Sequence, residues 1–427
     1  MQSKNAMNGS NNTTTSNLST ATSQKYRLEE VKTSEQKEEF RKLPFKIYAG
    51  DPNWIPHIRQ EVEQVFDKNH NTYFGHGEAI RWIMRDAVGD VVGRVAAFIN
   101  WRRAKTYEQP TGGMGFFECI DDQEAANMLF DRCKDWLQER DIEAMDGPVN
   151  FGENNKYWGL IVDNFNKPPY YGQNYNPEYY VRLFESYGFQ VYYRQIVFDK
   201  TFYDPLPELY QRRADRLKKE GHYKVVNFKK SEAAIFARHF IEIYNDAWQT
   251  HDNFTPMTEK QAFAMLQQIK PVADEDIIYF VYYDDEPVAF MVALPNINEV
   301  YRKVGDNMNL WGKLKFLYHK MNMKFHSCYG VAFGVKQKYQ ARGVEGLIFD
   351  DLQTKALKEK NFKYDNYIVT WVGDFNPKMI RVMEALGCVK SRTMATYRKL
   401  FDEHAIFTRS PIIGGKKMVK SKGNSDN

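Results

Sequence analysis

The sequence has few cysteines, no long apolar run and no marked excess of charge of either sign. Its four cysteines, Cys119, Cys133, Cys328 and Cys388, include no Cys-x-x-Cys pair, so it predicts neither a zinc site nor a disulfide framework. No apolar stretch approaches the roughly 20 residues that span a bilayer, and the first residues lack the apolar core of a signal peptide. The formal net charge is only +4, with basic residues spread among acidic ones, which argues against nucleic acid as a partner. These absences predict a cytoplasmic protein and imply no metal.

The length and composition of the chain favour two domains. Its 427 residues exceed what one core usually serves, and hydrophobic residues make up 43% of them. A Ser/Thr/Asn-rich segment at 1–24 predicts a disordered tail, and a Lys-rich segment at 409–427 predicts a basic flexible one. The second tail is typical of a solvated terminus, although peripheral membrane contact stays open. Between the tails we predict a domain at 25–204, a linker at 205–222 with the charged run QRRADRLKKEGH, and a domain at 223–408.

Predicted strands and helices follow the same order in the two halves of the chain. In the first half a hairpin, a third strand and a helix are expected at 81–84, 91–99, 115–120 and 123–138. In the second half the same order recurs at 277–283, 287–294, 329–335 and 346–357. Near the end of each half, NPEYYVRLFESYGFQ begins at Asn176 and NPKMIRVMEALGCVK begins at Asn376, each with Asn as a helix cap and Pro at the first helical position. The shared order predicts an internal duplication with one copy per domain.

The segment from Val331 to Leu357, VAFGVKQKYQARGVEGLIFDDLQTKAL, is the most informative for chemistry. An apolar strand leads into a turn with Gln, Arg and Gly, and then into an amphipathic helix. Free backbone N–H groups at such a helix start, reinforced by the helix dipole, can hold a pyrophosphate, and Arg342 adds positive charge nearby. An ordinary strand-to-helix turn has the same composition, so the motif depends on its context.

The context is a resemblance to the GNAT acyltransferases. The hexapeptide QARGVE at 340–345 resembles their acetyl-CoA loop, Gln/Arg-x-x-Gly-x-Gly/Ala, and YIVTWV at 367–372 is similar to their fifth strand. Asn376 and the following helix are similar to the family's Asn-x-x-Ala…Leu-Gly-Phe segment. The resemblance implies acetyl-CoA or a longer acyl-CoA as co-substrate. It also implies cofactor-binding residues, namely Phe333, Gly334, Val335, Gln340, Ala341, Arg342, Gly343, Val344, Gly346 and Asn376.

A closer resemblance is to a bacterial family of tandem-GNAT proteins. NDAWQTHDNFTPM from Asn245 and LPNIN from Leu294 are similar to segments of that family's second domain. GFFECIDD from Gly115, GPVNFGENNKYWGLIVDNF from Gly147 and NYNPEYY from Asn174 are similar to its first domain. The resemblance implies an α/β fold with two GNAT-like domains in tandem, each a mixed twisted sheet flanked by helices.

The sequence departs from the GNAT pattern at several positions. Glu345 replaces the third small residue of the pyrophosphate loop, and Met383 stands where many GNAT enzymes have a Tyr that protonates the leaving thiolate. In the first half, the acidic run Asp121-Asp122-Gln123-Glu124 follows the corresponding strand. We therefore expect only the second domain to hold CoA.

Two residues are candidate catalytic groups. His251 is nominated as general base because its loop borders the acceptor side in the family's fold, although a surface histidine is the alternative. Tyr329 is nominated to position substrate or relay a proton, although a strand aromatic is more often core. Glu118 and Glu153 are further candidates in the first domain. An aromatic cluster is expected to be partly core and partly the wall of a cleft between domains, and comprises Trp158, Tyr170, Tyr171, Tyr175, Tyr179 and Tyr180.

The resemblance implies an N-acyltransferase that moves an acyl group from a CoA thioester to an amine. The aromatic cluster favours an apolar or long-chain acceptor such as a sphingoid-like base, while an amino-acid-like amine also fits. A non-catalytic acyl-CoA or peptide binder is the alternative, because of Glu345 and Met383. Modification of a peptide or protein is a second alternative. The sequence leaves the oligomeric state open.

Overall fold

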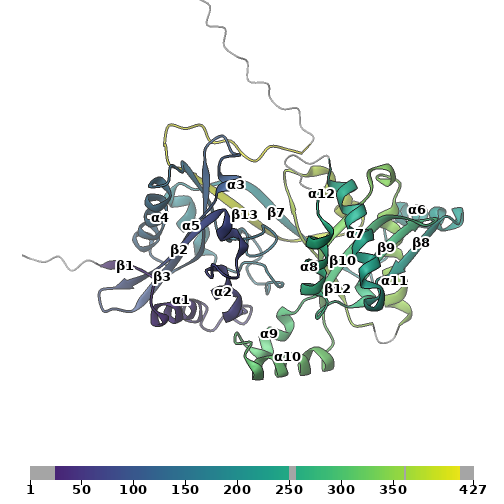
Figure 1. Ribbon diagram of the computed structural model, residues 1–427, viewed down its shortest axis with the longest axis horizontal. Coiled ribbons are helices and arrows are strands. Elements are labelled where there is room, and N and C mark those ends of the chain that lie inside the picture. The colour runs from purple at the N-terminus through teal and green to yellow at the C-terminus, as the bar shows by residue number, and fades with distance from the viewer. Residues whose placement is uncertain (1–24, 250–255, 360–361, 414–427) are drawn as a thin grey trace, which may run out of the picture.

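A computed structural model describes residues 25–249, 256–359 and 362–413 (Figure 1). The predicted tail at 1–24, the residue His251 and most of the predicted tail at 409–427 lie outside these ranges. The described chain forms one continuous sheet of mixed strands with helices on both faces, which places it in the α/β class.

The first half contributes five strands to one end of the sheet, in spatial order β1-β2-β3-β4-β5. These strands are β1 (Tyr26–Glu30), β2 (Gly77–Asp86), β3 (Val91–Asn100), β4 (Thr111–Cys119) and β5 (Ala144–Gly147). The helices of this half are α1 (Ser34–Ile47), α2 (Arg59–Val65), α3 (Trp101–Ala104), α4 (Gln123–Gln138) and α5 (Tyr179–Tyr187), with a 3-10 turn η1 (Thr72–Gly75). A two-residue strand, β6 (Leu160–Ile161), lies off the main path.

The second half repeats this plan at the other end of the sheet, in spatial order β12-β11-β10-β9-β8. Its strands are β8 (Tyr223–Asn227), β9 (Ile278–Tyr283), β10 (Glu286–Pro295), β11 (Ser327–Val335) and β12 (Asn366–Gly373). Its helices are α6 (Glu208–Glu220), α7 (Ala233–Trp248), α8 (Glu259–Ile269), α9 (Asn298–Val304), α10 (Leu310–Asn322), α11 (Val344–Lys358) and α12 (Pro377–Ala385). The 3-10 turns are η2 (Lys230–Glu232), η3 (Glu275–Ile277) and η4 (Gln337–Tyr339).

The two halves exchange their last strands at the centre of the sheet. β7 (Gln190–Thr201), the last strand of the first half, pairs antiparallel with β12, and β13 (Val389–Leu400) pairs antiparallel with β5. β7 and β13 also pair with each other, from Val389↔Asp199 to Arg398↔Gln190. The registers match across the exchange, because Leu400 lies opposite Ala144 and Thr201 lies opposite Asn366. The pairing relates the two halves by an approximate two-fold rotation between β7 and β13, as the predicted duplication requires.

Alternate strand residues fill two cores on opposite faces of the sheet. In the first half, Met84 packs with Phe130 of α4, whereas its neighbour Ile83 packs on the side of α1 and α2. The second half shows the same alternation, with Tyr279 packed on the side of α6 and α11 and Phe280 on the side of α7 and α8. Both halves therefore have the layered helix–sheet–helix arrangement.

The structure adds detail at one predicted segment and corrects one predicted helix cap. The predicted linker at 205–222 contains α6, whose Tyr210, Ala214 and Leu217 form a buried stripe against α11. The charged run hides this stripe because its polar residues occupy the solvent side of the helix. Asn376 caps α12 through a bond from Met379 N, but Asn176 does not cap α5. The Asn176 side chain instead pairs with the backbone N–H and C=O of Ile161.

Candidate active site

The strands β11 and β12 separate part-way along their length, and among the described residues no other strand pairs with β11 on that side beyond the separation, which gives an open strand edge. They are parallel neighbours only from Ser327↔Asn366 to Gly330↔Val369, although β11 continues to Val335. On its other side β11 stays paired with β10 as far as Val335. An unpaired strand edge presents N–H and C=O groups that an extended amide chain can bind as an added strand. The predicted pantetheine-binding residues Phe333, Gly334 and Val335 lie along this edge.

The predicted pyrophosphate loop lies at the end of that open edge. Gln340 Nε2 donates to the carbonyl oxygen of Val335 at 3.1 Å, which ties the loop to the strand. Gly343 precedes the first turn of α11 with φ +90°, a conformation that favours glycine. No side chain among the described residues caps α11, so N–H groups of its first turn are left for another acceptor. The loop therefore has the local geometry of an anion site.

Two basic side chains, Arg342 and Lys378, lie near this helix start. Ala341 and Arg342 are exposed, and the Arg342 guanidinium lies 5.4 Å from the centre of the Tyr339 ring. Lys378, at the start of α12, donates to Gln340 Oε1 at 3.3 Å.

Val344 and Gly346 are buried against α6, where Gly346 faces Tyr210. Asn376 acts on α12 as its cap, which is a structural role.

Glu345 and Met383 both point away from the open edge into packed surroundings. The Glu345 side chain is buried, and its Oε1 accepts a hydrogen bond from the Tyr210 hydroxyl of α6 at 3.3 Å. Burial and the neighbouring Glu345 raise the pKa of Tyr210 to about 12, so the hydroxyl remains a donor at neutral pH. Met383 belongs to the core between α12 and the sheet. Both departures from the GNAT pattern are therefore structural residues in this chain.

An aromatic cluster lies where the two halves meet beside β11 and β12. The Tyr329 ring lies between those of Tyr170 and Tyr171, with centroids 6.0 and 6.4 Å away. The Tyr170 hydroxyl donates a hydrogen bond at 2.6 Å to the carbonyl oxygen of Thr370. Thr370 directly follows Val369, the last residue of β12 that pairs with β11. Burial raises the pKa of Tyr329, so this residue stays protonated at neutral pH and cannot act as a base. Tyr329 can donate a hydrogen bond, while its raised pKa makes it a poor proton donor.

A carboxylate that no sequence motif indicates reaches this cluster. Glu61, on α2 of the first half, accepts hydrogen bonds from the hydroxyls of Tyr171 at 2.6 Å and Tyr157 at 3.2 Å. No local motif marks it, because its partners lie roughly 100 residues away in the chain. His251 lies outside the described residues, so its nomination stays a prediction.

The corresponding opening in the first half is closed by its own chain. β4 and β5 pair only from Thr111↔Ala144 to Gly113↔Asp146, and Val149 N then donates to Met114 O at 2.7 Å. The backbone of Val149 fills the gap so tightly that a Cβ on Gly115 would lie 1.8 Å from its oxygen. The α4 start carries Asp122 as its cap, so a carboxylate already occupies the place of an anion. These contacts leave this half without a phosphate site of the kind seen at α11.

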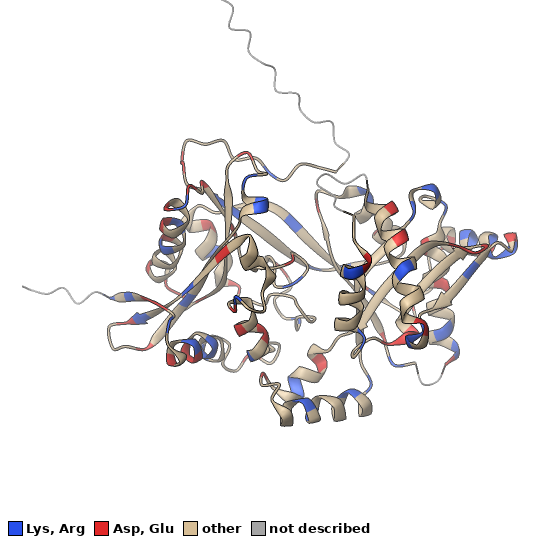
Figure 2. Cartoon of the chain, in the orientation of Figure 1, with Lys and Arg blue, Asp and Glu red and all other residues tan. Residues whose placement is uncertain are grey.

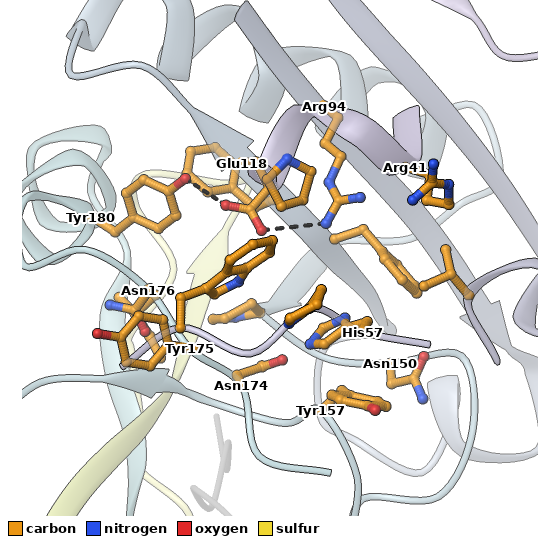
Figure 3. A pocket seen from close by; sticks show the side chains of 18 of the residues that line it. Arg41, His57, Arg94, Glu118, Asn150, Tyr157, Asn174, Tyr175, Asn176 and Tyr180 are labelled. Carbon is orange, nitrogen blue, oxygen red and sulfur yellow. Dashed lines mark hydrogen bonds and ion pairs between the residues drawn. The ribbon is translucent and has the colours of Figure 1, made fainter. Parts of the chain in front are cut away.

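A small polar pocket remains beside this closed opening (Figure 3). The Glu118 carboxylate accepts hydrogen bonds from the Tyr48 and Tyr180 hydroxyls at 2.9 and 2.8 Å and pairs with Arg94 at 3.3 Å. Burial outweighs the attraction of Arg94 and raises the pKa of Glu118. Burial, followed by repulsion from Arg94, lowers the pKa of His57 to about 3, so its imidazole is neutral at physiological pH. The free volume of about 50 Å³ holds a few water molecules and is too small for pantetheine.

The aromatic cluster predicted from the sequence divides among several places. Tyr175 and Tyr180 line the small pocket of the first half, and Tyr179 donates to Cys119 O at its edge. Trp158 donates to the Tyr193 hydroxyl at 2.9 Å. The candidate Glu153 accepts a hydrogen bond from Tyr73 at 2.6 Å.

A larger cleft of about 910 Å³ lies between the halves at the paired ends of β11 and β12. Pro168, Pro169, Tyr170 and Ile368 form part of its wall, so one ring of the predicted aromatic cluster, that of Tyr170, lines this cleft. Its polar and charged lining residues include Lys167, Asp199, Asn296, Glu299, Arg302, Lys303, Lys324, His326, Asp365 and Arg392. Tyr170 lines this cleft, and its hydroxyl binds Thr370 O just beyond the point where β12 leaves β11.

The described residues contain neither a grouped set of metal ligands nor a helix that could cross a membrane. In residues 25–249, 256–359 and 362–413, no three His, Cys, Asp or Glu side chains are grouped to hold a metal ion. Over the same ranges, no helix has the length and apolarity to cross a bilayer.

Comparison with known proteins identifies the fold. A solved GCN5-related glucosamine N-acetyltransferase region of a fungal multi-domain β-N-acetylglucosaminidase aligns with 88% of this chain at a TM-score of 0.50 and 12% identity. The alignment covers 38% of that fungal chain. Together with the repeated, strand-exchanged halves, it confirms the predicted fold. The chain is a tandem-GNAT protein by fold.

Curated relatives extend the comparison to sequence. A bacterial ceramide synthase of Caulobacter vibrioides is 28% identical over 377 residues, which cover 86% of this chain and 96% of the relative. The protein YghO of Escherichia coli is 28% identical over 367 residues, 84% of this chain and 91% of the relative. No protein-family model matches the chain. The tandem-GNAT chain is thus similar to two bacterial proteins over nearly their full lengths.

Proposed function

We propose that this tandem-GNAT protein is an acyl-CoA-dependent N-acyltransferase whose acceptor is a long-chain, sphingoid-like amine. The observation that carries the proposal is the open edge of β11, which ends at the uncapped start of α11. These two features suit the two parts of one ligand. The strand edge suits the amide-bearing pantetheine arm, and the helix start suits the pyrophosphate.

The second half would bind the co-substrate through the predicted residues. Phe333, Gly334 and Val335 would hold the pantetheine amides by backbone hydrogen bonds, and the turn from Gln340 to Gly346 would hold the pyrophosphate. Lys378 and Arg342 add positive charge beside the phosphates. Gly334 also keeps the strand close to Trp248, since a Cβ there would lie 2.7 Å from the indole.

The amine acceptor would enter from the interdomain cleft that Tyr170 lines. The cleft volume of about 910 Å³ falls within the range of small-molecule sites, and its charged lining suits a polar head group. Similarity to a ceramide synthase over 86% of this chain supports a sphingoid-like amine over an amino-acid-like one. A cytoplasmic location stays a prediction.

The reaction is direct acyl transfer. The neutral amine nitrogen forms a bond to the thioester carbonyl carbon, the C–S bond breaks, one proton leaves the nitrogen and the CoA thiolate takes up a proton. Glu61, linked to the cluster through the Tyr171 hydroxyl, is our candidate for accepting the amine proton through that hydroxyl or a water molecule. Tyr329, which burial keeps protonated, is our candidate hydrogen-bond donor to the developing oxyanion, and the thiolate takes its proton from water.

The test is acyl transfer by the purified full chain. The protein is incubated with sphinganine and either acetyl-CoA or palmitoyl-CoA, and the N-acyl product and free CoA are measured by mass spectrometry. We expect amide product with CoA release in equal amounts. CoA binding without any product over a panel of sphingoid, alkyl and amino-acid amines would instead identify a non-catalytic binder.

Two variants separate the candidate roles. Glu61→Gln keeps the hydrogen bonds to Tyr171 and Tyr157 possible but cannot accept a proton, so kcat should fall about 100-fold with CoA affinity unchanged. Glu153→Gln is the matched control, because Glu153 likewise accepts a hydrogen bond from a tyrosine of the first half. This variant should change kcat by less than about twofold. Equal loss in the two variants would contradict the role given to Glu61.

A further inference from the structure

Helix α10 carries an exposed apolar surface that the fold does not use. Six large apolar residues of this 13-residue helix are each 50–75% exposed, namely Leu310, Trp311, Leu314, Leu317, Tyr318 and Met321. Single exposed apolar residues are ordinary, but a continuous group of this size on one helix marks an interaction surface. We call these six residues the apolar face of α10.

The apolar face is bordered by lysines on both sides. At 100° per residue, its six members fall within an arc of about 120° on the helix. Lys313 and Lys320 follow along one border of the arc, and Lys315 follows along the other. The opposite side of the helix carries Phe316, whose ring centroid lies 5.4 Å from that of Tyr301 on α9 and which also packs against the core of the second half. The helix contains no acidic residue, as Figure 2 shows by the absence of red along α10.

Helices α9 and α10 form an insertion that the other half lacks. The connection from β10 to β11 covers residues 296–326, whereas the equivalent connection from β3 to β4 covers only residues 101–110. In Figure 1 the insertion lies at the lower edge of the view, below the junction of the two halves. Arg59 N donates to Asp306 O at 2.8 Å, and Gln60 Nε2 donates to Asn307 Oδ1 at 3.0 Å, so the insertion is held against the first half. The duplicated fold is complete without these helices, so their retention points to a separate role.

We infer that α10 docks the protein on the surface of an anionic lipid bilayer. A helix that lies in the bilayer interface has a Leu- and Trp-rich face bordered by Lys, which is the pattern of α10. Trp311 and Tyr318 stand at one edge of the apolar arc, where their amphipathic rings would meet the head groups. The lysines on both borders, with no acidic residue on the helix, complement an anionic lipid surface better than the mixed charges that surround most protein interfaces.

Docking through α10 would set the mouth of the interdomain cleft against the lipid. Arg302, Lys303, Asn322 and Met323 of the insertion line that cleft. A lipid amine could therefore pass from the bilayer to the cleft without crossing water. Bilayer binding itself does not depend on the proposed acyl transfer and is measured without substrate.

The experiment is flotation of the full chain with extruded vesicles. We expect the protein to float with vesicles of phosphatidylcholine containing about 30 mol% phosphatidylglycerol, and much less with pure phosphatidylcholine or at about 0.5 M NaCl. Trp311→Ser with Leu314→Ser should lower the partition coefficient at least about tenfold in both lipids, because it removes apolar area. Lys313→Gln with Lys315→Gln should remove mainly the preference for the anionic vesicles.

The matched control changes equally exposed apolar residues elsewhere. Leu209→Ser with Ile406→Ser removes side chains that are 49% and 84% exposed and should float like the wild type. Circular dichroism melting checks that each variant is folded. Absence of flotation by the wild type, or equal loss in the control, would overturn the inference. A dimer of the wild type in sedimentation velocity would also overturn the inference if the double variant Trp311→Ser with Leu314→Ser were monomeric. The apolar face of α10 would then bind a second copy of the chain.

Discussion

Substitution of Gly343 tests whether the start of α11 binds the CoA pyrophosphate. Gly343 has φ +90°, and an added Cβ would lie 3.1 Å from Cδ of Arg213. An L-residue in this conformation costs about 1–2 kcal/mol, so Gly343→Ala should lower the free energy of unfolding by about that amount. This variant measures the effect of shape and strain without added charge.

Gly343→Asp adds a negative charge at the same place. At about 5 Å from a phosphate charge and an effective dielectric constant of about 20–80, the repulsion is about 1–3 kcal/mol. CoA affinity should therefore fall about fivefold to hundredfold below that of Gly343→Ala. Arg213 beside the new carboxylate would reduce the effect, which favours the lower part of the range.

Isothermal titration calorimetry with CoA measures both affinities, and thermal melting shows which variants fold. Raising the NaCl concentration to about 0.5 M should narrow the difference between the two variants, because salt screens exposed charges. Equal CoA affinity for folded Gly343→Ala and Gly343→Asp would refute pyrophosphate binding at this loop.

Three further predictions concern titratable side chains in packed surroundings. Glu345→Gln should change CoA affinity by less than about twofold, because the Glu345 side chain is buried against Tyr210. A large change in CoA affinity by calorimetry would contradict this placement. Glu118→Ala should lower the free energy of unfolding, measured by urea titration, by about 3–5 kcal/mol, because it leaves Arg94 buried without its carboxylate partner. Adding Arg94→Met to the Glu118→Ala variant should restore part of the lost stability. Burial, and secondly the positive charge of Arg94, lower the pKa of His57 from 6.5 to about 3. At pH values between 6.5 and about 3 the unfolded chain therefore binds a proton at His57 that the folded chain does not. Stability should therefore fall with decreasing pH between about 6.5 and 3, by at most about 1.4 kcal/mol per pH unit from this group, and His57→Gln should flatten that slope in melting curves.

Local sequence signals predicted several central strands, the helices that follow them and the loop before α11. The helix expected at 123–138 matches α4, and the strand expected at 329–335 ends with β11 at Val335. These predictions succeeded because capping residues, turn residues and apolar periodicity act within a few residues of one another. The position of Gly343 before α11 belongs to the same kind of local signal.

Features set by distant contacts could not be predicted in this way. Nothing in the sequence near Val389 indicates that β13 enters the sheet beside β5, because that pairing joins residues about 250 apart. Glu61 escaped notice for the same reason, since its tyrosine partners come from another part of the chain. The acidic character of Glu345 suggested repulsion from phosphate, whereas only the packing of α6 reveals its partner Tyr210. The buried stripe of α6 was hidden by charged residues on its solvent side.

The exchange of β7 and β13 has a consequence for how such a chain arose. A single half would end in a strand that completes a neighbour's sheet, so a half-length ancestor with this topology would have formed its sheet as a symmetric homodimer. Joining two such copies end to end makes the pair obligatory and frees each copy to change independently. The anion site could then be kept at α11 and replaced by the cap Asp122 at α4, while one copy alone acquired α9 and α10. The central strand pair is in this sense a dimer interface that became part of one polypeptide.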